Sequence, residues 1–334
     1  MKYREKVQRE IPATAQMLAR PAAPSVSAID HGGVVLHAES ETEYHKWSTV
    51  PPTRDEVGVT AEKVMIITGS SDGIGAAAAR RLQANGHRVV VVGRSEDKTR
   101  AMGHELGADY YVADFSRLEE VRSLAATLSA AYPRIDVLAN NAGGVFGDPA
   151  KTVDGFEKTF QINHLAPFLL TRLLLDRLVS SRATVLQTSS VGARMAGKLD
   201  LDDLDHDRRF SPVRAYSAAK LENILFTKEL HRRFHGEGVS AVAFHPGSIA
   251  SGFGTRSDSR LMRFITTNPI SRAVVLATPD TGGSRLAWFA ESRPGVDWEP
   301  GNYYEKRTIK RTNSQAYDAD LARRLWDRSE QLVR

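Results

Sequence analysis

A tyrosine and a lysine four residues apart are the clearest candidates for chemistry in this sequence. Tyr216 and Lys220 stand in the run Tyr-Ser-Ala-Ala-Lys, within a helical pattern that spans residues 215–234. Residues spaced i and i+4 share one face of a helix, so the phenol and the ammonium can meet at one site. A free tyrosine has a pKa of about 10, and a neighbouring positive charge lowers it by stabilising the phenolate. The pair is a candidate acid/base for a carbonyl or hydroxyl oxygen, although this spacing is also common on solvated helix faces.

Polar residues follow two apolar runs and interrupt a third apolar stretch. Asn-Asn-Ala-Gly at residues 140–143 follows the run that ends at Ala139, and a second run closes in Thr-Ser-Ser, whose last residue is Ser190. Asn163 interrupts the apolar face of a helical stretch over residues 156–175. Each feature alone is compatible with a turn or a helix cap. Together, at strand ends of one sheet, they predict a site beside the tyrosine and lysine.

A glycine-rich run at residues 68–75, TGSSDGIG, lies between an apolar run and an alanine-rich helical pattern. Glycines let a backbone turn tightly and approach a pyrophosphate, and the following helix offers unpaired N–H groups to that anion. The position directly after an apolar run favours this interpretation over a plain turn. We expect the contacts of this turn with a dinucleotide to come from Gly69, Ser71, Asp72, Gly73, Ile74 and Gly75.

The residues after the second apolar run indicate which dinucleotide binds. An acidic residue there suits the ribose 2′-hydroxyl of NAD, whereas an arginine suits a 2′-phosphate. The run ends in Gly-Arg-Ser, with Arg94 and Ser95 and no carboxylate. A guanidinium and a hydroxyl are both donors to phosphate, so NADP(H) is favoured over NAD(H). The alternative is a solvated surface arginine.

Six apolar runs alternate with helical patterns, and this order predicts an α/β fold with a doubly wound parallel sheet. The helical patterns include residues 118–131 and 215–234. We expect strands at residues 64–67, 88–92, 110–113, 135–139, 183–188 and 239–244. The series predicts one domain over residues 61–334.

Residues 1–60 differ from the rest because prolines interrupt every candidate helix and no apolar period is sustained. The prolines are Pro12, Pro21, Pro24, Pro51 and Pro52. We expect an irregular N-terminal extension, either a passive tail or an arm that docks a partner.

Composition excludes several classes of protein. The net charge is +5, but the basic residues are spread among nearly as many acidic ones, so we expect no nucleic-acid partner. No apolar run reaches the roughly 18 residues of a membrane span, and the first ten residues lack the apolar region of a signal peptide. The sequence holds no cysteine, which excludes disulfides, thiolate metal ligands and thiol nucleophiles. We expect a cytoplasmic protein with no metal site and no membrane contact.

From about Lys63 to the C-terminus, these motifs resemble the short-chain dehydrogenase/reductase family in its single-domain branch, and so imply a Rossmann fold. The resemblance implies that Tyr216 is the catalytic acid/base and that Lys220 tunes it and holds the nicotinamide ribose. It implies that Ser190 hydrogen bonds the substrate oxygen, because the family usually uses the second serine of the pair. Asn163 would order a water molecule in the proton relay to Lys220.

The resemblance also extends the cofactor site beyond the glycine-rich turn. His-Pro-Gly at residues 245–247 resembles the turn beneath the nicotinamide, and Ile249 would offer backbone groups to the carboxamide. Ser251 stands where the family usually has threonine, and Asp114 resembles the acidic residue that binds the adenine amine. The implied cofactor contacts outside the turn are Arg94, Ser95, Asp114, Asn141, Ala142, Gly143, Tyr216, Lys220, Pro246, Gly247, Ile249 and Ser251.

Finer features resemble the retinol-dehydrogenase-like members. Ser190 and Tyr216 lie about twice as far apart as is usual in this branch, and the extra segment includes residues 199–204. The runs at 301–304 and 324–326 resemble the same subgroup. The microsomal enzymes of that subgroup have an N-terminal membrane anchor, which we do not expect here, and this puts a retinoid substrate in doubt.

A segment after the Pro-Gly turn suggests the chemistry of the substrate. Residues 252–269 carry apolar side chains in a region that covers the substrate in this family, and Val145, Phe146 and Met195 would extend the wall. We expect a lipophilic ketone, aldehyde or alcohol, with ordinary helix packing as the alternative.

The expected function is an NADP(H)-dependent oxidoreductase that interconverts a carbonyl and an alcohol. The resemblance implies a homo-oligomer, either a dimer or a tetramer. The alternative is a catalytically silent NADP-binding sensor or scaffold component. Proteins of that kind tend to lose the tyrosine or the lysine, and this chain retains both Tyr216 and Lys220.

Overall fold

An eight-stranded sheet forms the frame of residues 61–247 and 278–334, the part of the chain that this computed structural model describes. The strand order is β3-β2-β1-β4-β5-β6-β7-β8, and every pair is parallel except β7 with β8. The strands are β1 (Val64–Thr68), β2 (Arg88–Gly93), β3 (Asp109–Val112), β4 (Val137–Asn140), β5 (Thr184–Thr188), β6 (Ser240–His245), β7 (Tyr303–Glu305) and β8 (Thr308–Ile309). The chain order reverses between β1 and β4, and ligands of such sheets bind at the carboxyl ends of the strands beside that point.

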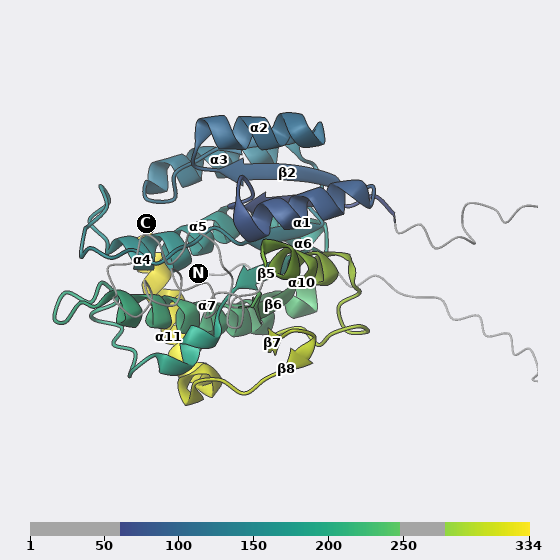
Figure 1. Cartoon of the computed structure of the whole chain (residues 1–334). Coiled ribbons are helices and arrows are strands. Elements are labelled where there is room, and N and C mark those ends of the chain that lie inside the picture. Colours follow the sequence, from purple (N-terminus) through teal and green to yellow (C-terminus); the bar gives the residue numbers. More distant parts are fainter. Residues whose placement is uncertain (1–60, 248–277) are drawn as a thin grey trace, which may run out of the picture. The chain divides into compact units, whose positions relative to one another are not determined.

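Helices cover both faces of the sheet (Figure 1), as the alternating pattern predicted. One face packs against α1 (Gly73–Ala84), α2 (Glu96–Leu106) and α10 (Pro279–Glu291). The other packs against α3 (Leu118–Ala131), α5 (Ala166–Leu173), α7 (Pro212–Phe234) and α11 (Ala319–Leu332). In β1, Met65 and Ile67 belong to the core under α1, α2 and α10, which we call the first core. Ile66 belongs to the core under α3, α5, α7 and α11, which we call the second core. Strands buried on both faces need continuous apolar runs, which explains why the sequence shows them.

The last two strands were not predicted. β7 has three residues and β8 two, and neither contains the longer apolar run of a buried central strand. β7 is positioned by its parallel pairing with β6, and β8 returns antiparallel to β7 at the sheet edge. Pairing with a neighbouring strand, rather than a local sequence pattern, defines both.

The helical stretch over residues 156–175 is not one regular helix, contrary to the expectation from its apolar period. It begins as α4 (Lys158–Phe160), widens into the π-helical segment η1 (Gln161–Leu165) and continues as α5. The N–H of Ala166 donates to the Gln161 carbonyl, five residues back, which is the bond of a π-turn. Asn163 lies inside this segment, and π-turns of this kind are frequent at functional sites.

Shorter elements complete the description. They are α6 (Leu175–Ser180), η2 (Val191–Met195), η3 (His235–Glu237) and η4 (Ser314–Tyr317). No helix within residues 61–247 and 278–334 is long and apolar enough to cross a membrane. The expected extension, residues 1–60, lies outside the described residues.

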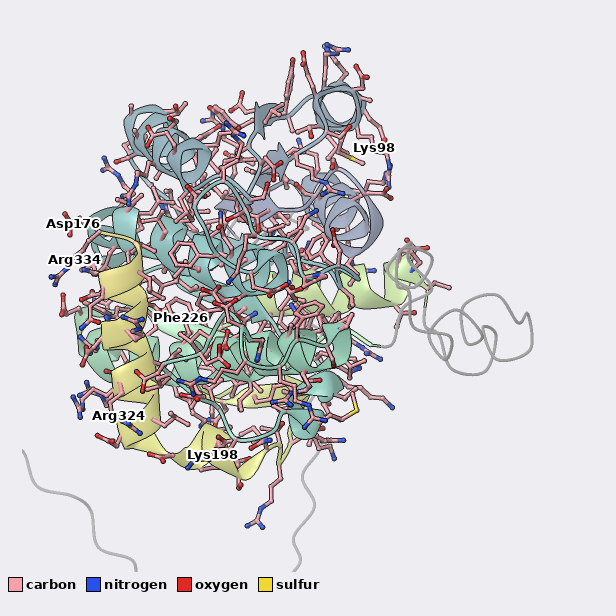
Figure 2. All side chains as sticks on the ribbon, turned by 90° about the vertical axis from the view of Figure 1, so that its left-hand side faces the viewer. Lys98, Asp176, Lys198, Phe226, Arg324 and Arg334 are labelled. Atoms are coloured by element: carbon pink, nitrogen blue, oxygen red, sulfur yellow. The ribbon has the colours of Figure 1, made fainter. Side chains whose placement is uncertain are left out.

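The C-terminal helix docks on the second core through Trp326. Its indole is buried and stacks on Phe226 with ring centroids 5.6 Å apart, and it meets the edge of Phe168 at 5.1 Å. Figure 2 shows Phe226 beside α11. The Arg233 guanidinium lies 4.8 Å from the indole centroid. Because Phe168 belongs to α5, this contact fixes the helix that continues from the π-helical segment.

We expect Trp326→Ala to lower the free energy of unfolding by about 3–5 kcal/mol, because it removes a large buried ring and leaves a cavity. Urea unfolding of wild type and variant measures the difference. Val296→Ala is the control, since Val296 is 69% exposed and should change the value by less than about 0.5 kcal/mol. Equal effects of the two substitutions would show that α11 does not depend on Trp326.

Candidate active site

The N-terminal part of α7 places Tyr216 and Lys220 one helical turn apart. Ser211 caps the helix, its Oγ accepting from the Arg214 N–H at 3.2 Å, and Pro212 begins it. Proline suits the first helical position because it has no N–H to lose there. The Tyr216 and Lys220 side chains therefore share one face of α7, as their spacing predicted.

Lys220 is buried against the end of β5. Its Nζ donates to the Thr188 carbonyl at 3.1 Å and lies 5.5 Å from the centroid of the Tyr216 ring. Burial lowers the pKa of Lys220 to about 7, because the charged ammonium loses its hydration. A lysine with this pKa exchanges its proton readily near neutrality.

The two serines after β5 have different partners. The Ser190 and Tyr216 side chains are hydrogen bonded to each other, and Ser190 Oγ accepts from the Gly192 N–H at 3.0 Å. Ser189 Oγ donates to the backbone carbonyl of Lys220 at 2.7 Å, which ties α7 to β5. Ser190 is thus the serine that faces the phenol, and Ser189 supports the helix.

The pKa of Tyr216 differs from the sequence-based expectation, which was a value lowered by the lysine. Burial raises the pKa of Tyr216, and the hydrogen bond with Ser190 opposes this rise. The physical reason is desolvation of both groups: Lys220, with a pKa near 7, carries only part of a charge at neutrality. In this state the phenol is protonated, so it is set to donate a proton.

Asn163 holds the loop that follows β4. Its Nδ2 donates to the carbonyls of Gly144 and Thr159, each at 2.9 Å, and its Oδ1 accepts from the Gly144 N–H at 3.1 Å. A Cβ on Gly143 would lie 2.4 Å from Asn163 Oδ1 and 3.4 Å from Lys220 Nζ. Only glycine fits between these two side chains. The role of Asn163 in ordering a water molecule stays a prediction.

The phosphate-binding turn and the loop after β4 are joined by Asn141 and Thr68. Asn141 Nδ2 donates to the Thr68 carbonyl at 3.0 Å, and Thr68 Oγ1 accepts from the backbone N–H groups of Asn141 and Ala142, each at 3.0 Å. A Cβ on Gly75 would lie 2.3 Å from the Gly69 carbonyl oxygen, so helix and turn meet backbone to backbone. The N-terminus of α1 lies beside this turn, which fits a dinucleotide pyrophosphate.

Arg94 and Ser95 follow β2, and their side chains are available to bind a phosphate group. Arg94 is exposed and forms no ion pair with the other residues that the structure describes. Ser95 occupies the N-cap position of α2 but makes no side-chain capping bond. A guanidinium beside a hydroxyl fits a phosphate group. Asp114, the predicted adenine contact, uses one carboxylate oxygen to accept from the Ser116 N–H at 2.9 Å.

The structure describes only some of the other predicted site residues. Pro246 and Gly247 follow β6 at the same sheet edge, and Gly247 has a φ of 110°. Ile249, Ser251 and the segment 252–269 lie outside the described residues. Of the predicted substrate wall, Val145 and Phe146 are half-buried and Met195 is exposed.

Two further buried polar side chains, Asn223 and His164, were not predicted. The Thr188 carbonyl accepts from Asn223 Nδ2 at 3.3 Å as well as from Lys220. His164 is buried next to Asn163, with its Nε2 3.0 Å from Ser329 Oγ of α11, and burial lowers its pKa to about 4. The spacing of Asn223 from Lys220 would have placed it on the same helix face. A backbone carbonyl such as that of Thr188 leaves no signal in a sequence.

Within residues 61–247 and 278–334, no three His, Asp or Glu side chains gather into a group able to hold a metal ion.

Residues 63–261 match the family model described as short chain dehydrogenase. The chain is 39% identical over 295 residues to a candidate daunorubicin C-13 ketoreductase of Streptomyces sp. (strain C5), covering 85% of this chain and 98% of that protein. It is 34% identical over 283 residues to human retinol dehydrogenase 13, covering 81% and 84%.

Solved structures show the same fold. An uncharacterized protein from Mycobacterium paratuberculosis superposes with a TM-score of 0.65 at 31% identity, covering 82% of this chain and 94% of that one. An NADP complex of Pseudomonas aeruginosa RhlG matches with a TM-score of 0.58 at 24% identity, covering 74% and 95%. The chain belongs to the short-chain dehydrogenase/reductase family, close to its retinol-dehydrogenase-like members, and is a Rossmann-fold oxidoreductase of carbonyls and alcohols that uses a nicotinamide cofactor.

Proposed function

We propose that this enzyme uses NADP(H) to interconvert a carbonyl and an alcohol on a lipophilic small molecule, with Tyr216 as the acid/base. The observation that carries the proposal is the contact of Ser190, Tyr216 and Lys220 at the carboxyl ends of the strands, beside the phosphate-binding turn.

In the direction of reduction, the substrate carbonyl oxygen accepts hydrogen bonds from Ser190 and Tyr216. When bound, the reduced nicotinamide supplies the hydride that the carbonyl carbon receives. The Tyr216 hydroxyl gives its proton to the oxygen as negative charge develops there, and a proton from Lys220 then restores the phenol. In oxidation the same protons move in reverse. The pKa of Lys220 near 7 suits this exchange, because both of its protonation states are populated at neutrality.

The preference for NADP(H) rests on Arg94 and Ser95. Arg94 is exposed and has no ion pair among the described residues, so it breaks no ion pair with them when it binds a 2′-phosphate. The absence of a carboxylate at the end of β2 removes the usual partner of the NAD ribose.

The proposal of a lipophilic substrate rests on two features. Phe146 presents a half-buried ring in the loop that follows β4, three residues after Gly143, and Lys158 Nζ lies 5.1 Å from the centroid of that ring. The relatives are named for a ketone of daunorubicin and for retinol, both carbonyl or alcohol groups on large carbon skeletons. The proposal also includes a cytoplasmic location, with which a chain without cysteine is compatible, and a homo-oligomer, either a dimer or a tetramer. A screen of NADPH and NADH oxidation against ketones, aldehydes and quinones would identify the substrate class.

We expect Tyr216→Phe to lower kcat by about 10²–10⁴-fold, because the general acid is lost while the ring is kept. Steady-state kinetics with a carbonyl substrate from the screen measure this. Tyr304→Phe is the matched control, since Tyr304 is another buried phenol, bonded to the Glu299 N–H, and should leave kcat within about two-fold. Full turnover by Tyr216→Phe with every active substrate would refute the mechanism.

We expect Arg94→Ala to raise the KM for NADPH by about tenfold or more and to change that for NADH by less than about two-fold, because a charged hydrogen bond to phosphate contributes about 1.5–3 kcal/mol. Arg88→Ala is the control, because Arg88 lies at the opposite end of β2 in an ion pair with Asp109. Equal changes for both cofactors would argue against a 2′-phosphate at Arg94.

We expect stability to rise with pH above 7 because of Lys220. Its pKa is about 7 in the folded protein and near 10.5 when unfolded, so in between only the unfolded chain binds this proton. Lys220→Met should remove this contribution and flatten the rise between pH 7 and about pH 9. Urea unfolding midpoints of both proteins across that range measure it, and parallel curves would contradict the lowered pKa.

A further inference from the structure

His164 is a buried imidazole in the π-helical segment η1, directly after Asn163. Three phenylalanine rings pack around it, with centroids 5.7 to 6.4 Å from its own, and these are Phe160, Phe168 and Phe226. Burial lowers the pKa of His164 to about 4, so the ring is uncharged at neutral pH. An uncharged imidazole has one donor and one acceptor nitrogen, and burying it costs free energy unless both have partners.

The two partners of His164 fix which nitrogen carries the proton. Nε2 lies 3.0 Å from Ser329 Oγ of α11, and the Asn223 side chain of α7 is the hydrogen-bonding group on the other side. Within residues 61–247 and 278–334, His164 Nδ1 and Asn223 Oδ1 have no partner other than each other. Because an amide oxygen can only accept, Nδ1 carries the proton and Nε2 accepts from the Ser329 hydroxyl.

Asn223 connects this imidazole to Lys220. Its Nδ2 donates to the Thr188 carbonyl at 3.3 Å, and the same oxygen accepts from Lys220 Nζ at 3.1 Å. The amide can point its NH2 group at Thr188 only while its oxygen faces His164, since a flipped amide would set two oxygens against each other. His164 therefore determines which end of Asn223 meets Thr188. The chain is buried from Ser329 to Lys220, so bulk water does not compete for these bonds.

We propose that His164 is a positioning residue for Lys220, acting through Asn223 and the Thr188 carbonyl. The inference rests on the proposed role of Lys220 as the proton source for Tyr216. With Asn223 on one lone pair of the Thr188 oxygen, Lys220 Nζ is held at the other. Loss of the His164 donor lets the Asn223 amide turn, and the Thr188 oxygen then holds Lys220 in no single direction. Proton return to Tyr216 slows, so the effect falls on kcat more than on KM.

Two substitutions of His164 separate the hydrogen bond from the packing. His164→Asn keeps an amide N–H at the place of Nδ1 and loses the contact with Ser329, whereas His164→Gln reaches Ser329 and loses the donor to Asn223. We expect His164→Gln to lower kcat about tenfold, through misplacement of the proton source, and His164→Asn only about two- to threefold. Asparagine leaves the larger cavity, so a role in packing alone gives the opposite order. Steady-state kinetics with a carbonyl substrate from the screen measure both values, and KM should change by less than about two-fold.

Asn223→Ala removes the link and should lower kcat as much as His164→Gln does. The double variant should be no slower than Asn223→Ala alone, because both changes break one chain. The solvent deuterium isotope effect on kcat should rise in Asn223→Ala and in His164→Gln, because the proton step then limits turnover. His87→Gln is the matched control. His87 is another buried imidazole, but it precedes β2 at the opposite edge of the sheet, so kcat should stay within about two-fold.

Equal kcat values for His164→Asn and His164→Gln would overturn the proposal and leave the ring as packing only. Additive losses in the double variant, or an unchanged isotope effect, would also overturn it. Lys220→Met is a separate readout of the proposed function, since full turnover by that variant would remove Lys220 as the proton source. A slow Lys220→Met beside a wild-type kcat in His164→Gln would remove only the role of His164. Thermal unfolding midpoints above the assay temperature confirm that each variant is folded.

Discussion

The carbonyl oxygen of Thr188 is the fixed point on which the site depends. It ends β5, where Thr188 pairs with Phe244 of β6, and it accepts hydrogen bonds from Lys220 and Asn223 of α7. Burying a lysine is costly unless its ammonium has a partner, and this carbonyl supplies one. The register of β5 against β4 and β6 therefore determines where Lys220 lies, and through α7 where Tyr216 meets Ser190.

The cofactor turn and the catalytic loop form one hydrogen-bonded unit. Thr68 at the end of β1 accepts from the backbone of the loop after β4, and Asn141 returns a bond to the Thr68 carbonyl. The same loop passes between Asn163 and Lys220 at Gly143. A displacement of the phosphate-binding turn would thus reach Lys220 through these hydrogen bonds and close contacts, which suits a reaction that needs the hydride and proton donors in fixed relation.

The sequence was most informative where local pattern and burial agree. β1 and β2 are buried apolar runs, and the helix of Tyr216 and Lys220 follows from its period. β3 was also predicted, although this edge strand is largely exposed. Sequence reasoning failed where a partner far along the chain sets the structure. β7 exists because β6 pairs with it, and the Lys220 partner is a backbone carbonyl, which no residue type reveals. The pKa of Tyr216 was also mispredicted, because the spacing of Tyr216 and Lys220 shows their proximity but not the desolvation of both.

The π-helical segment has a consequence for how the chain tolerates change in length. The Ala166 N–H bonds the Gln161 carbonyl, five residues back, so Ala166 takes the place that the residue before it would have in an α-helix. The segment therefore absorbs one extra residue while α5 keeps its rotational phase, with Phe168 against Trp326. Losing one residue among Gln161–Leu165 would restore regular winding and leave that packing in place, but it would remove the widened turn from which the Asn163 side chain reaches the carbonyls of Gly144 and Thr159. The chain length of this segment is thus set by the loop after β4 and not by the core.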